Sequence, residues 1–314
     1  MFRQALMILA ALAMLVPAGT GWGVMINDAA SDAKGRSAGT FDLGKKTVLL
    51  NSGHEMPVIG LGTWTLSNRQ AEEIVYGALK CGVRLIDTAR YYRCEAGVGR
   101  GVKRAMAEGI VSREDVFITS KIMPGDYGRA AQGIEDSLRE LDVSYVDLML
   151  IHQPGPDDRA VYRALEEAVK DGKVRSIGIS NYYTREALDA VLAFARITPA
   201  VIQNENHLLY QNDKLREYAS TYGIVMESWY PLGGRGHVAE HLGNPVVTGL
   251  AAKYGRTPAQ IILRWHIQAG YVAIPGTSDP AHAAENFGVF DFSLTGEEMR
   301  ELAGQNAMCR YETW

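Results

Sequence analysis

The chain has 314 residues, a formal net charge of −4 and 47% hydrophobic residues, which fits one large domain with a full hydrophobic core. The mildly acidic balance offers no basic surface, so we expect no nucleic-acid partner. Three widely spaced cysteines, Cys81, Cys94 and Cys309, indicate neither a disulfide framework nor a zinc site.

The N-terminal segment, residues 1–24, resembles a secretory signal. A short basic lead precedes an apolar run over residues 5–16, and small residues follow; this run is short for a membrane-spanning helix. The alternative interpretation is a misassigned start, with Met25 as the first residue. Residues 25–45 are polar and predict a disordered linker, followed by one domain over residues 46–314. Membrane contact is expected only if the N-terminal segment is retained.

The rest of the chain predicts alternating strands and helices. Residues 48–59 indicate a β-hairpin with a polar turn. Capping boxes at Ser67/Gln70 and Thr257/Gln260 mark two helix starts, and residues 232–245 form a glycine-rich loop. Eight strands are expected near residues 59–62, 84–87, 116–121, 146–152, 174–180, 200–203, 224–227 and 271–275. This pattern over about 250 residues is typical of an α/β fold, the (β/α)8 TIM barrel, here with an N-terminal β-hairpin.

Polar residues stand at the ends of three successive apolar runs. Asp87 ends the second predicted strand, Lys121 the third and His152 the fourth, and Tyr92 lies in the loop after Asp87. The C-terminal ends of barrel strands carry the active site in such folds. Each residue alone is most simply a helix cap, a packed aromatic, a solvated lysine or a core histidine. Their joint occurrence at successive strand ends predicts a proton-transfer site instead.

The same stretches resemble the aldo-keto reductase family, over about residues 46–304. The matching segments are residues 82–95, 118–121, 150–154, 172–181 and 284–286, and several motifs in order are more specific than any single one. The most similar subgroup is that of bacterial 2,5-diketogluconate reductase-like members. The resemblance implies an enzyme that reversibly reduces small aldehydes, ketones or keto-sugars to alcohols with NAD(P)H.

The resemblance also implies roles for the residues at the strand ends. Tyr92 would be the general acid, and because a free phenol has a pKa of about 10, we expect the Lys121 ammonium to lower that value. Asp87 would hold Lys121 in place, and His152 would orient the carbonyl oxygen as a neutral donor. Trp64, Tyr92 and His152 are expected to contact the substrate.

A nicotinamide coenzyme is implied by further positions of the resemblance. Ser180, Asn181 and Gln203 would bond its carboxamide, and Trp229 would stack on its ring. The full set expected to contact the coenzyme is Gly62, Thr63, Ser180, Asn181, Gln203, Trp229, Pro231, Leu232, Gly233, Ile274, Gly276, Thr277, Ser278, His282, Glu285 and Asn286. NADP(H) is expected, but Gly276 and His282 replace the cations that usually favour its 2′-phosphate, so NAD(H) stays open.

Several alternatives remain at this point. One is a cofactor-binding barrel that acts as a redox sensor or binding module with little turnover. Another is a glycoside hydrolase, for which Glu227 at the end of the seventh strand lacks a partner carboxylate. Residues 237–241 match a zinc pattern, but they lie in the glycine-rich loop, so no metal is expected. The coenzyme favours a cytoplasmic enzyme, whereas the N-terminal segment favours a periplasmic or exported one.

Overall fold

The computed structural model describes residues 37–123 and 128–313. The signal-like segment over residues 1–24 and most of the predicted linker therefore lie outside the described residues. Across the two described ranges, none of the helices combines the length and the apolar character needed to span a bilayer.

A small antiparallel sheet precedes the barrel. Its strands are β1 (Phe41–Asp42), β2 (Thr47–Leu49) and β3 (Glu55–Pro57), in the order β1-β2-β3. The predicted hairpin is β2 with β3, whereas β1 was expected to lie in a linker. That linker ends earlier than residue 45, because Phe41 pairs with Val48 and its side chain is buried in the core.

Eight parallel strands then form the barrel, in the order β11-β10-β9-β8-β7-β6-β5-β4. Parallel bridges from Ile59 to Ala273 and from Gly62 to Gly276 join the first and last strands, which closes the predicted (β/α)8 barrel. The strands are β4 (Leu61–Gly62), β5 (Leu85–Asp87), β6 (Phe117–Ile122), β7 (Val146–Ile151), β8 (Val174–Ser180), β9 (Val201–Glu205), β10 (Val225–Trp229) and β11 (Tyr271–Ala273).

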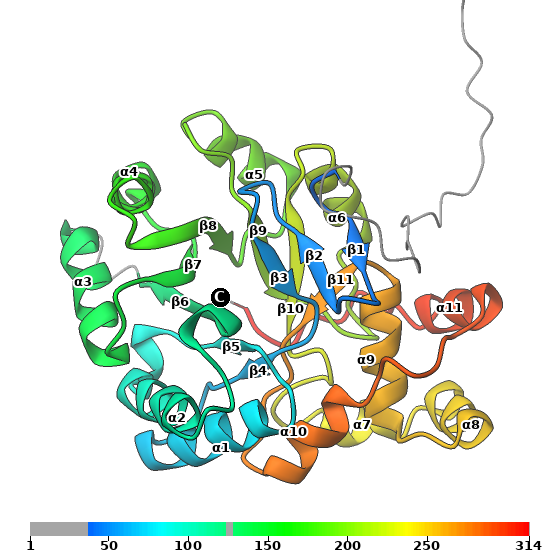
Figure 1. Cartoon of the computed structure of the whole chain (residues 1–314). Coiled ribbons are helices and arrows are strands. Elements are labelled where there is room, and N and C mark those ends of the chain that lie inside the picture. The colour runs from blue at the N-terminus through cyan, green and yellow to red at the C-terminus, as the bar shows by residue number, and fades with distance from the viewer. Residues whose placement is uncertain (1–36, 124–127, 314) are drawn as a thin grey trace, which may run out of the picture.

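Helices surround these strands (Figure 1). Both predicted capping boxes are present, at Ser67 before α1 and at Thr257 before α9. The helices are α1 (Asn68–Lys80), α2 (Glu95–Ala107), α3 (Ala130–Leu141), α4 (Asp158–Lys170), α5 (Arg185–Leu192), α6 (Asp213–Ser220), α7 (Val238–Leu242), α8 (Pro245–Tyr254), α9 (Pro258–Gln268), α10 (Pro280–Phe287) and α11 (Gly296–Ala303).

Two of these helices were not expected from the sequence. α7 lies inside the segment predicted to be a glycine-rich loop, and α8 begins at its end. The side chain of Asn244 accepts hydrogen bonds from the backbone N–H groups of Val246 and Val247, and Pro245 occupies the first turn. An asparagine cap followed by proline is a recognised helix start, so the sequence did carry a signal for α8.

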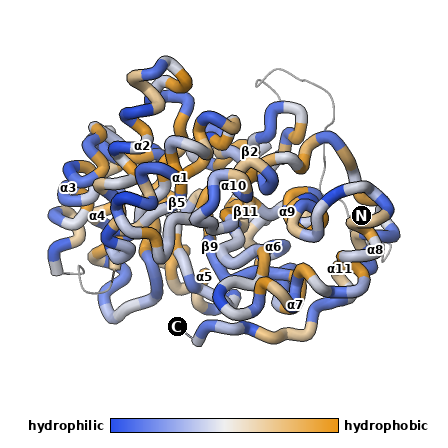
Figure 2. Tube along the Cα trace, turned by 90° about the horizontal axis from the view of Figure 1, so that it is seen from below, coloured by the Kyte–Doolittle hydropathy of each residue, from blue (hydrophilic) through white to orange (hydrophobic). Residues whose placement is uncertain are grey.

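The apolar core has two layers. One lies between the helices and the outside of the barrel, and hydrophilic and hydrophobic residues accordingly alternate along the helices (Figure 2). The other lies inside the barrel, where Leu85, Leu148 and Val272 pack with Val48 and Met56 of the N-terminal sheet. That sheet therefore closes the N-terminal end of the barrel, and the opposite end is left for a site.

Candidate active site

Three of the four predicted catalytic residues are in direct contact at the C-terminal end of the barrel. Lys121, in β6, places its Nζ atom 2.6 Å from Asp87 Oδ1 at the end of β5 and 3.1 Å from Tyr92 Oη. The carbonyl oxygen of Thr88 accepts a third hydrogen bond from Nζ at 3.0 Å. Tyr92 is held by a short 3-10 turn, Arg90–Tyr92, that directly follows β5.

Burial and charge set the protonation states of this group. Lys121 is fully buried, which acts to lower its pKa, but the Asp87 carboxylate and the Tyr92 oxygen outweigh this and raise the pKa above its usual value. Burial raises the pKa of Asp87, and the nearby ammonium counteracts that shift. At 2.6 Å we take the pair as ionised, because one charge stabilises the other.

The pKa of Tyr92 differs from the prediction. Lys121 does act to lower it, as expected, but burial is the larger effect and raises the pKa of Tyr92 to about 12. The prediction of a lowered value is therefore wrong for this structure. The phenol keeps its proton at neutral pH, which is the state that a proton donor needs.

His152 follows β7 and completes the group. Its ring lies edge-on to the ring of Tyr92, with the two centroids 5.5 Å apart. Burial, and then the charge of Lys121, hold the pKa of His152 well below 6.5. The imidazole is therefore neutral at physiological pH, and a neutral ring has one N–H to donate.

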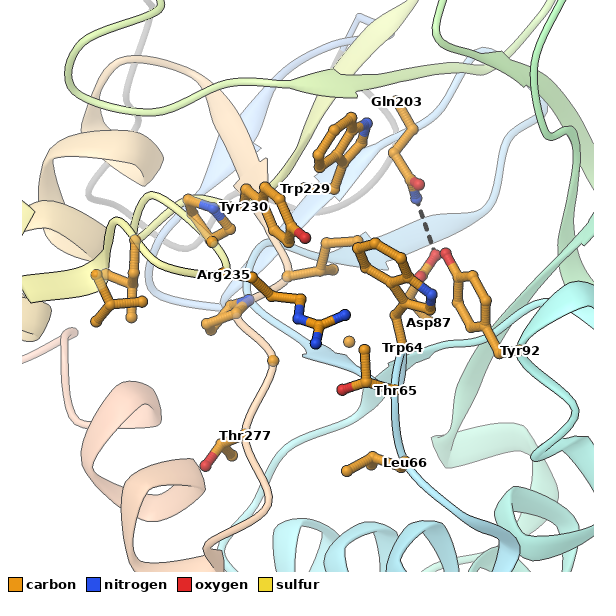
Figure 3. A pocket seen from close by; sticks show the side chains of 18 of the residues that line it. Trp64, Thr65, Leu66, Asp87, Tyr92, Gln203, Trp229, Tyr230, Arg235 and Thr277 are labelled. Atoms are coloured by element: carbon orange, nitrogen blue, oxygen red, sulfur yellow. Dashed lines mark hydrogen bonds between the residues drawn. The ribbon is translucent and has the colours of Figure 1, made fainter. Parts of the chain in front are cut away.

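Asp87, Tyr92 and His152 line a cavity of about 470 Å³, and Figure 3 shows Asp87 and Tyr92 at one end of it. Lys121 lies behind Tyr92 and does not line it. The predicted substrate residues Trp64, Tyr92 and His152 all line the cavity. So do fourteen of the sixteen predicted coenzyme residues, namely Gly62, Ser180, Asn181, Gln203, Trp229, Pro231, Leu232, Ile274, Gly276, Thr277, Ser278, His282, Glu285 and Asn286.

Thr63 and Gly233 are the two predicted coenzyme residues that do not line the cavity. Thr63 is fully buried, and its hydroxyl donates to the carbonyl oxygen of Asp87 at 2.9 Å. Gly233 has a φ of 91°, and a Cβ there would lie 2.2 Å from the ring of His241. Both positions shape the loops around the cavity.

The side chains predicted for the nicotinamide end are bonded to one another. Gln203 Nε2 donates to Asp87 Oδ2 at 2.8 Å. Asn181 donates from Nδ2 to the carbonyl oxygen of His152 at 2.8 Å and accepts at Oδ1 from Trp229 Nε1 at 3.2 Å. The catalytic group and the predicted carboxamide site are thus one network.

Three prominent lining residues were missed by sequence reasoning. Tyr91 and Tyr230 line the cavity, and the ring of Tyr230 lies 4.8 Å from Trp229 and 5.8 Å from Trp64. Arg235 extends into the cavity from the loop after β10 (Figure 3), where it is the one lysine or arginine among the described lining residues. Tyr91 directly precedes the predicted residue Tyr92, Tyr230 directly follows Trp229, and Arg235 lies within the predicted glycine-rich loop, so these neighbours were the available signal.

The zinc-like pattern over residues 237–241 does form a short helix, contrary to expectation, because α7 covers residues 238–242. The ring of His237 stacks on Tyr311 at 3.6 Å, and His241 Nε2 lies 3.0 Å from Tyr311 Oη. The two histidines therefore pack against the C-terminal segment. Over residues 37–123 and 128–313, no cluster of metal-ligating side chains is found.

Comparisons with known proteins agree with this geometry. The model of the "Aldo/keto reductase family" matches residues 58–307. "Methylglyoxal reductase DkgA" of Escherichia coli K12 is 40% identical over 261 residues, 82% of this chain and 92% of the relative. "Glyoxal reductase" of Bacillus subtilis is 42% identical over 266 residues, 83% and 93% of the two chains.

A solved structure is also similar. The crystal structure of MGS-M4, an aldo-keto reductase from a deep-sea metagenome library, has a TM-score of 0.81 and 36% identity and covers 85% of this chain and 97% of that one. These similarities support the reductase interpretation over the redox-sensor alternative. The chain therefore belongs to the aldo/keto reductase family and is an oxidoreductase that reduces carbonyl groups.

Proposed function

We propose that the enzyme reduces small aldehydes, ketones or keto-sugars with NADP(H) and that Tyr92 is its proton donor. The observation that carries the proposal is the contact of Tyr92 Oη with Lys121 Nζ at 3.1 Å, backed by Asp87 at 2.6 Å, on the wall of the cavity. Small dicarbonyls are the first substrates to try, because two relatives are named as methylglyoxal and glyoxal reductases.

The residues present fit a nicotinamide coenzyme. Trp229 presents an aromatic ring to the cavity, and Gln203 and Asn181 present amides. An aromatic face and amide groups are the partners that a nicotinamide ring and its carboxamide need. When bound, the coenzyme would supply a hydride to the carbonyl carbon.

The protein side chains would manage the proton. As negative charge develops on the carbonyl oxygen, Tyr92 Oη donates its proton to that oxygen, an effect worth about 10²–10⁴ in rate. The Lys121 ammonium then stabilises the phenolate that remains, and Asp87 keeps the ammonium in place. His152, neutral because of its burial, would donate a hydrogen bond to the same oxygen.

Discrimination between the two coenzymes is expected to be weak. The family resemblance favours NADP(H), and a relative from Malus domestica is named as an NADP-dependent dehydrogenase. Gly276 and His282 line the cavity where a lysine and an arginine would favour a 2′-phosphate. Arg235 and the hydroxyls of Thr277 and Ser278 remain as donors for phosphate oxygens.

A nicotinamide coenzyme also favours a cytoplasmic location. N-terminal sequencing of the native protein tests this, because a start at Met25 would leave no signal-like segment. A mature N-terminus produced by cleavage near residues 18–21 would favour export instead.

The activity is tested by following NADPH and NADH consumption with methylglyoxal in the parent enzyme and in Tyr92→Phe. We expect turnover to fall by about 10²–10⁴, with coenzyme binding, followed by quenching of tryptophan fluorescence, unchanged. Tyr222→Phe is the control, because Tyr222 is a tyrosine that is 43% exposed and does not line the cavity. Full turnover by Tyr92→Phe would contradict the assignment of the proton donor.

A further inference from the structure

A buried carboxyl group, that of Glu227, lies directly behind the catalytic network. β9 and β10 are neighbouring parallel strands whose register places Glu227 beside Gln203. Both side chains are buried, and Glu227 Oε2 accepts a hydrogen bond from Gln203 Nε2 at 2.7 Å. Glu227, which lacked a partner carboxylate in the sequence, thus has an amide as its partner in the structure.

The same nitrogen also reaches Asp87. Gln203 Nε2 donates to Asp87 Oδ2 at 2.8 Å as well as to Glu227 (Figure 3 shows the bond to Asp87). Because Gln203 bridges the two carboxyl groups, the space between them cannot hold a sugar and a water, as a glycoside hydrolase requires. Glu227 is therefore not half of such a carboxylate pair.

The two contacts fix the orientation of the Gln203 amide. A primary amide nitrogen carries two hydrogens, and here both are donated to carboxyl oxygens. Turning the amide by half a rotation would bring its oxygen against the ionised Asp87, which is unfavourable. Since Gln203 also lines the cavity, its carbonyl oxygen is the polar atom left for a ligand, and that atom can only accept.

We propose that Glu227 is a positioning residue that, together with Asp87, orients the Gln203 amide so that its oxygen accepts a hydrogen bond from the carboxamide N–H2 group of the coenzyme. This inference rests on the proposed function, because it concerns the binding of the same coenzyme. It adds a residue that itself lines no part of the described cavity and acts through Gln203.

The protonation of Glu227 suits this role. Burial, and next the charge of Asp87, raise the pKa of Glu227 to about 8, while Gln203 and Lys121 act in the opposite direction. Near pH 7 the group is therefore mostly a neutral acid, whose Oε2 accepts the hydrogen bond from Gln203. It supplies an acceptor without placing a second buried charge beside Asp87.

The test compares NADP+ with its 3-acetylpyridine analogue, in which a methyl group replaces the carboxamide NH2. Binding of both is measured by tryptophan fluorescence in the parent, in Glu227→Leu, which removes the acceptor, and in Glu227→Gln, which keeps one. We expect Glu227→Leu to weaken NADP+ about three- to tenfold, to leave the analogue unchanged, and Glu227→Gln to restore the parent ratio.

Equal weakening of both ligands, or of neither, would overturn the positioning role. If Glu227→Leu does not fold, Gln203→Leu replaces it and is expected to abolish the same preference for NADP+ over the analogue; a preference that survives would overturn the proposal. Methylglyoxal reduction by the parent separates the two proposals. A parent that turns over while Glu227→Leu keeps the parent ratio refutes the positioning alone, whereas a parent that binds neither ligand refutes both.

Discussion

The two ends of the cavity are built in opposite ways. At the proton-transfer end, Asp87, Lys121 and Gln203 are buried and bonded to one another over 2.6–2.8 Å. At the other end, Gly276 and His282 are exposed, on the segment that leads into and forms α10. The first end is held by an ion pair whose two charges stabilise each other, and the second is exposed to solvent.

This difference indicates which part of the reaction can change. A buried ion pair that loses one partner leaves an uncompensated charge, which costs several kcal/mol. A change at an exposed position away from caps and tight turns usually costs little. The buried charged network is therefore tied to the stability of the fold, whereas the exposed residues that we propose to set the coenzyme preference can change at little cost.

The largest effect is expected from Lys121→Met. It leaves Asp87 buried with Gln203 as its remaining side-chain donor, so we expect the free energy of unfolding to fall by about 3–5 kcal/mol and turnover to be lost. Lys170→Met is the matched control, because Lys170 pairs with Glu167 at 3.3 Å with side chains 76% and 60% exposed, and such pairs contribute little. Urea unfolding measures the stability of both variants, and equal losses would contradict the expected cost of breaking the buried pair.

A second prediction concerns pH and Glu227. Its pKa is about 8 in the folded protein against 4.5 as the model-compound value, so between these pH values the folded state binds more protons than the unfolded state. Stability from this group therefore falls as pH rises from about 4.5 to about 8. The unfolding free energy of the parent should drop relative to that of Glu227→Gln over this range. Parallel curves for the two proteins would contradict a raised pKa.

The sequence predicted that Asp87, Lys121 and His152 meet, because each ends an apolar run and successive strand ends come together at one rim of a barrel. Apolar runs ending in Asp87, Lys121 and His152 are visible without a structure, and the resemblance assigned Tyr92 between them. The structure adds that Lys121 contacts Asp87 and Tyr92 directly. The sign of the Tyr92 pKa shift was missed, because it depends on burial by the whole barrel.

Glu227 shows why other parts of the site could not be predicted. Its contact with Gln203 depends on the register of β9 against β10, and no spacing in the sequence specifies that register. Arg235 and α7 belong to a segment whose glycines predict a loop but not its path. α8 is different, because Asn244 followed by Pro245 is a recognised helix start that is visible in the sequence.

The smallest effect is expected at the exposed end of the cavity. Lysine and arginine introduced together as Gly276→Lys and His282→Arg should lower the KM for NADPH about tenfold relative to NADH, equivalent to about 1.4 kcal/mol. A Cβ at residue 276 would lie 3.5 Å from the carbonyl oxygen of Gly62, an ordinary contact, so stability should not change.

The coenzyme preference gained in this way should decline with added salt, because exposed charges are screened. Gly249→Lys on α8 is the control, since that position is exposed and a Cβ there meets nothing within 4 Å. If KM changed equally for NADPH and NADH, the added cations would be acting on the diphosphate that both coenzymes share. The exposed end would then set coenzyme affinity and not coenzyme choice, and the preference would have to come from Arg235 or another lining residue.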